Sequence, residues 1–230
     1  MGVKVGFAAP AIAGAGYVGS IPTTSTSRKI RGTVNDFAEL ASVEEIKARM
    51  VDYGTDLIVP GFVDAHVHYP QTAIIASWGK RLIDWLNSYT FPEEIRLADP
   101  DYAAKIAGRY LDIALSHGTT TMASYCTTAP VSVTAYFEAA QARGMRVVGG
   151  KTCMDRNAPD GLIDTAQSAY DDSKDLIDTW HGRGRLSYAI TPRFSPTSTP
   201  EQLAALGGLW QERPDCLMQT HLSEQTEEIA

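Results

Sequence analysis

The chain has 230 residues, which is enough for one large domain or two small ones. Its formal net charge of −7 argues against nucleic acid as a partner and favours a small, uncharged ligand. No apolar run approaches the roughly 20 residues of a membrane span, and the three cysteines are odd in number and widely spaced, so we expect free thiols in a cytoplasmic protein that binds no membrane.

Residues 1–57 carry few signals of regular structure. The Ala- and Gly-rich stretch 5–19 is interrupted by Pro10 and by glycines, which argues against a signal peptide. Residues 41–50 have a helical pattern. We therefore expect 1–57 to form a short irregular N-terminal arm, or part of a flanking domain, and 58–230 to form a separate domain.

The segment that begins at Pro60 contains the most informative motif, the run Asp64-Ala65-His66-Val67-His68. Side chains alternate between the faces of a β-strand, so His66 and His68 should project to the same side, together with Asp64. Val63, Ala65 and Val67 should then pack under covering helices. Two imidazoles two positions apart on one strand can bind a single metal ion.

Beyond this segment, short β-rich runs alternate with helical patterns. We expect parallel strands near residues 61–68, 119–126, 146–154, 186–194 and 217–224. Asp99 before Pro100 predicts a helix start, and Thr199 with Gln202 predicts a capping box. His117 and His181 each precede a glycine, which places them at helix ends rather than among metal ligands.

Alternating strands and helices predict an α/β fold with a parallel sheet and right-handed crossovers. The polar residues gather at the carboxyl ends of the predicted strands, where barrels and open sheets both place their chemistry. No Gly-rich phosphate loop follows any of these strands, which argues against a dinucleotide or nucleoside triphosphate site.

His221 lies near the end of the last predicted strand, in the run Gln219-Thr220-His221-Leu222-Ser223-Glu224. With His66 and His68 it supplies three nitrogen ligands, and catalytic zinc sites keep three or four protein ligands plus water. A metal lowers the pKa of water from about 15.7 toward 7, and the carboxylate of Glu224 can then move protons. The alternative for Glu224 is a solvated charge at the start of the next helix.

At this point the sequence resembles a known family. The run from Pro60 to His68 looks like the first-strand signature of the metal-dependent amidohydrolase superfamily, and within it the chain is most similar to the guanine deaminases. Further segments resemble that family in the same order, at residues 68–71, 84–94, 117–121, 153–157, 191–194 and 219–224.

The resemblance implies a TIM-type (β/α) barrel and a zinc-dependent hydrolysis of guanine to xanthine and ammonia. It implies that His66, His68 and His221 bind one zinc ion and that Glu224 is the proton shuttle. It also implies four contacts to the purine substrate, from Gln71, Trp85, Arg193 and Phe194. An arginine fork suits a purine carbonyl, whereas a surface ion pair for Arg193 and ordinary core packing for Phe194 and Trp85 are the structural alternatives.

The chain departs from the family in two ways. Residues 1–57 do not resemble its β-rich flanking domain, and a later histidine and aspartate of the family, on the sixth and eighth strands, have no counterpart before Ala230. About five of the eight βα units of a barrel are accounted for, so we expect an incomplete enzyme that is inactive alone and retains zinc weakly. The alternatives are a deaminase of another purine- or pterin-like heterocycle, or a non-catalytic metal-binding or interaction fragment. A homo-oligomer is compatible with either.

Overall fold

The computed structural model describes residues 59–79, 81–224 and 228. The expectations for 1–57, including the irregular arm and the helix at 41–50, lie outside the described residues. Parallel strands make up one sheet in the order β1-β2-β3-β5-β4, with β6 paired to β5. The strands are β1 Phe62–His68, β2 Thr119–Tyr125, β3 Arg146–Gly150, β4 Thr152–Cys153, β5 Leu186–Pro192 and β6 Leu217–Met218.

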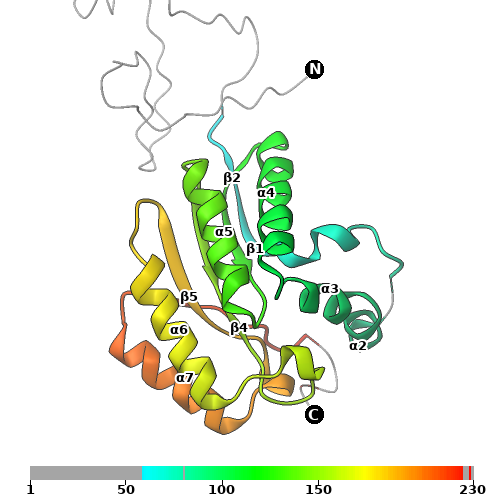
Figure 1. Cartoon of the computed structure of the whole chain (residues 1–230), viewed down its shortest axis with the longest axis vertical. Coiled ribbons are helices and arrows are strands. Elements are labelled where there is room, and N and C mark those ends of the chain that lie inside the picture. The colour runs from blue at the N-terminus through cyan, green and yellow to red at the C-terminus, as the bar shows by residue number, and fades with distance from the viewer. Residues whose placement is uncertain (1–58, 80, 225–227, 229–230) are drawn as a thin grey trace, which may run out of the picture. The chain divides into compact units, whose positions relative to one another are not determined.

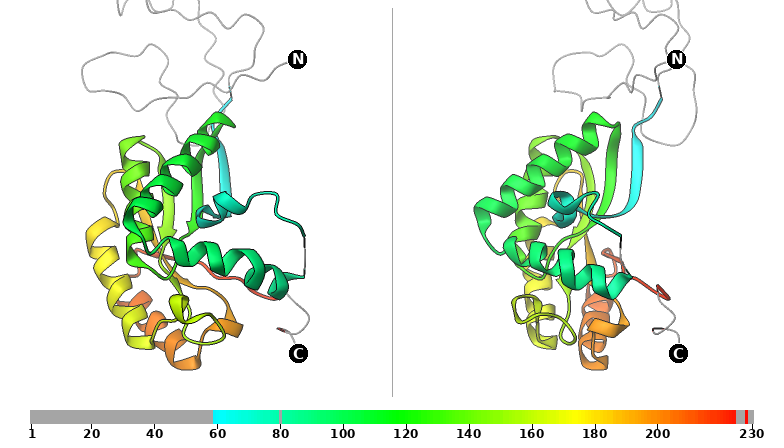
Figure 2. Two further views of the ribbon diagram at one scale, coloured as in Figure 1. Left: turned by 45° about the vertical axis from the view of Figure 1, so that its right-hand side comes forward. Right: turned by 90° about the vertical axis from the view of Figure 1, so that its right-hand side faces the viewer.

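Helices follow the strands and cover one face of the sheet (Figures 1 and 2). The longer helices are α4 Pro100–Ser116, α5 Pro130–Ala142, α6 Ala166–Trp180 and α7 Pro200–Glu212. A connection between β1 and α4 holds a 3₁₀ helix at Tyr69–Ile74, α2 Leu82–Trp85, a π-helical turn at Leu86–Thr90, and α3 Phe91–Arg96. Short 3₁₀ turns lie at Asp160–Leu162 and Ser195–Thr197. No helix in these described ranges is long and apolar enough to cross a bilayer.

The main core lies between the sheet and this helical layer. It contains apolar side chains from α4, α5, α6 and the strands, among them Leu111, Phe137, Val147 and Ile177. Gly150 allows β3 to approach β5 closely, since a Cβ there would stand 1.8 Å from the Ala189 carbonyl oxygen. The all-parallel pairing and the covering helices confirm the predicted α/β fold.

Strand β1 does not alternate as its sequence predicts. Val63 is 68% exposed, and only Val67 of the three apolar residues packs against the core. One extra residue of β1 lies between Asp64 and Val67, which pair with Met122 and Ser124 of β2. Such a bulge shifts the parity of the strand, so Asp64 and Val67 both face the helical layer. His66, inside the bulge, and His68, just after it, face the other way.

Two other strand predictions need correction. The predicted strand 146–154 is interrupted at Lys151, whose backbone N–H donates to the Tyr188 hydroxyl at 3.1 Å instead of to a strand carbonyl. The predicted strand 217–224 ends at Met218. The chain beyond it still follows β5, because the backbone N–H of His221 donates to the Arg193 carbonyl at 3.0 Å. His221 therefore lies just past a strand rather than on one.

Of the two predicted helix starts, the one at Asp99 is confirmed in full and the one at Thr199 only in part. The Asp99 side chain accepts from the Tyr102 backbone N–H, as predicted. Thr199 caps α7 by accepting from the Gln202 N–H, but the reciprocal half of the predicted capping box is wrong. The Thr199 N–H is already taken by the Asp155 carboxylate at 2.7 Å. The Gln202 side chain instead turns inward and is fully buried.

Candidate metal and substrate site

Three histidines converge at the carboxyl ends of the strands. His66 and His68 come from the end of β1 and His221 from the segment after β6, and their ligand nitrogens all lie within 4.8 Å of one another. The ring centroids of His66 and His221 are 4.9 Å apart. The two imidazoles of β1 thus share one side of the strand, and a residue about 150 positions later completes the group.

Hydrogen bonds define the protonation of this cluster. His221 Nδ1 lies 2.8 Å from the Arg193 carbonyl oxygen, which can only accept, so Nδ1 carries the proton and Nε2 presents its lone pair. That lone pair faces His68 Nε2 at 3.0 Å. In this contact His68 Nε2 is therefore the N–H donor, and its buried Nδ1 has no partner among the described residues. If the His68 proton moves to Nδ1, the imidazole nitrogens that lie within 4.8 Å of one another form the set of ligands that a divalent ion such as zinc prefers, so the residues present fit a metal.

The environment favours the neutral form of the His68 and His221 rings. Burial, reinforced by the positive charge of Arg193, holds the pKa of His68 well below its usual value. Burial also lowers the pKa of His221, against the opposing effects of its hydrogen bond to the Arg193 carbonyl and of the Glu224 charge. Neutral imidazole is the form that binds metals, so both shifts favour metal binding near neutral pH.

These shifts predict a pH-dependent stability of the metal-free chain. In the unfolded state both histidines take up protons near their usual pKa of 6.5, whereas the folded rings stay neutral to lower pH. Their contribution is therefore complete above 6.5 and is lost as the pH falls toward the lowered folded-state values. Urea unfolding at pH 7.5 and 5.5 should give the lower free energy of unfolding at pH 5.5.

The matched variants for this measurement are His68→Gln and His117→Gln. His117 is exposed at the end of α4, so His117→Gln should keep the pH dependence of the parent chain. His68→Gln should weaken it, and an unchanged dependence in that variant would contradict the assignment.

Next to the histidines lies a buried ion pair that joins two of the predicted substrate contacts. Arg193 follows β5 and is 3% exposed, and Glu94 of α3 is 1% exposed. The guanidinium donates from Nη1 to Glu94 Oε2 at 2.7 Å and from Nη2 to Oε1 at 3.3 Å. Gln71 Nε2 donates to the same Oε1 at 3.4 Å. The carbonyl of Arg193 orients His221, so the histidine cluster and this ion pair are parts of one site.

The other predicted residues surround this pair. Phe194 is buried in a second apolar cluster with Leu86, Phe91, Met154 and Leu162, against which Trp85 packs. The Phe194 ring also lies edge-on to His221, with centroids 6.3 Å apart. Glu224 is exposed and follows His221 by three residues, and its charge favours a higher pKa for both His221 and Tyr125.

Two residues of the site were missed from the sequence. Tyr125 ends β2 and stacks on His68 with ring centroids 4.6 Å apart. Its hydroxyl is buried and has no hydrogen-bond partner among the described residues, and burial raises the pKa of the phenol. Glu94 is the second. The sequence pointed to Glu94 only through the segment 84–94, which resembles the guanine deaminases. Without a visible partner, a glutamate on a helix is expected to be a surface charge.

A second group of ligand-type side chains, His181, Asp215 and Cys216, lies before β5 and β6. His181 Nδ1 accepts from the Tyr188 backbone N–H at 3.0 Å, so the proton of the neutral ring is on Nε2. That nitrogen faces Asp215 at 3.3 Å and serves as a donor, not as a ligand. His181 ends α6 and His117 ends α4, as predicted.

The buried ion pair predicts a stability effect. Arg193→Ala leaves the Glu94 carboxylate buried without its counter-charge, which should cost about 3–5 kcal/mol of the free energy of unfolding. The matched control is Arg81→Ala, which removes an exposed guanidinium that lies 3.8 Å from the exposed carboxylate of Asp84 and should cost far less. Urea denaturation measures both. Equal losses would contradict a desolvated pair.

Comparison with known proteins agrees with the motifs. A family model described as the amidohydrolase family matches residues 57–230. A guanine deaminase of Escherichia coli K12 is 52% identical over 182 residues, covering 79% of this chain and 42% of that protein. A probable guanine deaminase of Deinococcus radiodurans is 38% identical over 214 residues, covering 93% and 47%.

Structure comparison gives the same result. The crystal structure of guanine deaminase from C. acetobutylicum, with bound guanine in the active site, matches with a TM-score of 0.74 and 32% identity, covering 80% of this chain and 45% of that one. The chain spans less than half the length of these proteins. Its sheet is accordingly part of a TIM-type barrel, and with a family model that covers most of its length, the chain belongs to the amidohydrolase family.

Proposed function

We propose that this chain, with any further residues that its gene encodes, hydrolyses guanine to xanthine and ammonia. The observation that carries the proposal is the three-histidine cluster beside the buried group of Arg193, Glu94 and Gln71. Ligands for a metal and groups that match a purine edge lie at one end of the sheet, where α/β enzymes bind substrates. Similarity to guanine deaminases supports guanine as that purine.

His66, His68 and His221 would hold one zinc ion. The support is the chemistry of the donor set: three imidazoles whose ligand nitrogens lie within 4.8 Å of one another, with His221 Nε2 unprotonated and directed at His68. When bound, the metal would supply a water molecule acidic enough to lose a proton near neutral pH.

The remaining residues bind the purine and move the proton. Arg193 and Gln71 would hydrogen-bond the ring, and Phe194 and Trp85 would form an apolar wall that excludes water. The Glu224 carboxylate would take a proton from the attacking water and deliver it to the exocyclic amino group of guanine. Carbon 2 gains the oxygen of water, the second proton of water ends on ring nitrogen 3 of xanthine, and the bond from carbon 2 to the amino group breaks as ammonia leaves.

Two broader features belong to the same proposal. We assign residues 58–230 to the barrel part and 1–57 to a separate N-terminal segment. The three cysteines, Cys126, Cys153 and Cys216, are free and buried. Unpaired thiols are typical of a reducing compartment, which supports the cytoplasm as the location.

The test is ammonia release from guanine by the complete protein as its gene encodes it, with xanthine identified as the product. We expect stoichiometric ammonia and xanthine, and loss of both after His66→Ala or His221→Ala. Turnover of another heterocycle in place of guanine would change the substrate assignment. Purine binding or zinc binding without turnover of any heterocycle would indicate a non-catalytic module.

A further inference from the structure

The carboxylate of Glu94 is in contact with both residues proposed to bind the purine. It is 1% exposed, and its two oxygens accept three hydrogen bonds: two from Arg193, at 2.7 and 3.3 Å, and one from Gln71 at 3.4 Å. Nothing in the proposed chemistry requires an acid here, because Glu224 supplies the proton transfer.

Glu94 determines which way the Gln71 amide points. An ionised carboxylate can only accept, so the Gln71 nitrogen must face Glu94. The Gln71 oxygen, on the other branch of the amide, is therefore directed away from Glu94. Gln71 is half-buried, so this oxygen is available as an acceptor to a bound molecule.

Glu94 also orients the arginine. Each terminal nitrogen of the Arg193 guanidinium bears two hydrogens, and one N–H of each donates a hydrogen bond to Glu94. The remaining N–H groups are held in a fixed plane and remain donors to a ligand. The result is a donor and an acceptor presented side by side, with neither able to change its role while Glu94 is ionised and in place.

We propose that Glu94 is a positioning residue that makes this site selective for heterocycles with a lactam edge, that is, a ring N–H next to a carbonyl. The inference rests on the proposed function and deepens it. In guanine the carbonyl at position 6 accepts from Arg193, and the N–H at position 1 donates to the Gln71 oxygen. Adenine presents the inverse pattern, an amino donor at position 6 and an acceptor at position 1, and leaves both protein groups unpaired.

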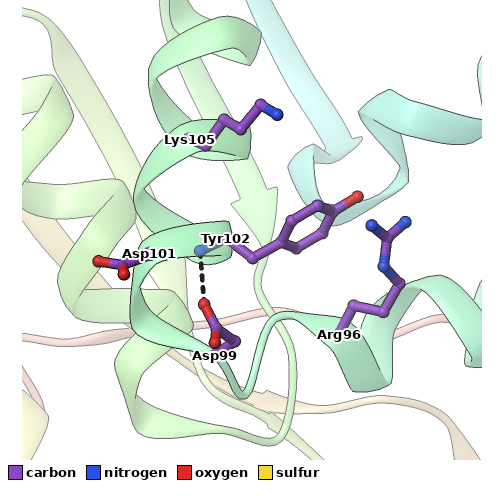
Figure 3. A pocket seen from close by; sticks show the side chains of 5 residues that line it. All are labelled: Arg96, Asp99, Asp101, Tyr102 and Lys105. Atoms are coloured by element: carbon purple, nitrogen blue, oxygen red, sulfur yellow. Dashed lines mark hydrogen bonds between the residues drawn. The ribbon is translucent and has the colours of Figure 1, made fainter.

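The helix that carries Glu94 is fixed from its other side. The neighbouring Glu93 accepts from Arg96 at 2.8 Å and from the Tyr102 hydroxyl of α4 at 2.5 Å. The Arg96 guanidinium lies 4.0 Å from the centre of the Tyr102 ring. Figure 3 shows these two side chains next to each other. Glu93 is 5% exposed and has no contact with Gln71 or Arg193 among the described hydrogen bonds, so it offers a matched control on the same helix.

The experiment compares Glu94→Gln with Glu93→Gln by isothermal titration calorimetry of two purines. Hypoxanthine has the lactam edge and no amino group at position 2, so it is not a substrate for deamination there, and adenine has the inverse edge. The complete protein should bind hypoxanthine about 10³-fold more tightly than adenine, because a buried polar site rejects a mismatched partner strongly.

In Glu94→Gln the new amide oxygen must face Arg193, so the new amide nitrogen faces Gln71. Gln71 then turns its own oxygen inward and presents a donor to the ligand. We expect the ratio of the two dissociation constants to fall at least about tenfold in this variant, and to stay at the parent value in Glu93→Gln. If Glu94 had only a structural role, Glu94→Gln would weaken the binding of both purines by the same factor. The ratio would then be unchanged, which would overturn the inference.

Gln71→Leu is the second variant, in case Glu94→Gln folds poorly. It removes the acceptor at a half-buried position and should lower the same ratio; an unchanged ratio contradicts the inference. Ammonia release from guanine, measured in parallel, reports on the proposed function alone. If the parent protein deaminates guanine but the ratio is unchanged in Glu94→Gln, the proposed function stands and the role of Glu94 is rejected. If the ratio falls in Glu94→Gln but the parent protein does not deaminate guanine, the role of Glu94 stands and the proposed function is rejected.

Discussion

Replacing Glu224 by glutamine should abolish most guanine turnover while leaving the metal content unchanged. The amide has the size of the carboxylate but cannot take up a proton at neutral pH. Loss of a general acid or base typically costs about 10²- to 10⁴-fold in rate. The Glu224 charge acts on His221 and Tyr125, which fits a carboxylate beside the metal cluster.

The measurement is kcat for guanine together with zinc per chain by elemental analysis. Glu201→Gln, an exposed glutamate in the first turn of α7, is the matched control and should retain the parent rate. If Glu224→Gln turns over guanine at the parent rate, Glu224 is a solvated charge and another group must move the proton.

The second large effect is the choice between guanine and adenine. Arg193 has donors and no acceptor, so it complements the guanine carbonyl and opposes the adenine amino group. Because Arg193 is 3% exposed and paired with Glu94, its remaining donors cannot be satisfied by water when the wrong base binds. Discrimination in kcat/KM should reach about 10⁴-fold.

Ammonia release assayed on both bases gives this ratio directly. Arg193→Lys retains the charge against Glu94 but loses the planar fork, so it should lower kcat/KM for guanine far more than for adenine. Comparable rates on the two bases in the parent protein would remove guanine as the assigned substrate without affecting the metal cluster.

The parts of the fold that follow from local chemistry could be predicted from the sequence. Asp99 starts α4 because a short acceptor side chain precedes a helical run that opens with proline. The parallel order follows from strands separated by helices. The shared side of His66 and His68 agrees with the two-residue period of a strand, although His66 lies inside the bulge of β1.

What could not be predicted depends on contacts between distant segments. The extra residue between Asp64 and Val67 is defined only against β2. The Asp155 carboxylate displaces Gln202 from the predicted capping box, although the two residues lie far apart in the sequence. Glu94 is the clearest case. Its burial depends on Arg193, 99 positions later, and a glutamate with no visible partner in the sequence is expected on a surface.

The central claim is that His66, His68 and His221 form one metal centre. X-ray absorption at the zinc edge of the complete protein, combined with elemental analysis of the three His→Ala variants, tests it most directly. We predict about one zinc per chain with nitrogen ligands at about 2.0–2.1 Å, and loss of zinc in each variant. Zinc that is retained in all three variants, or that is bound mainly by sulfur, would contradict the account.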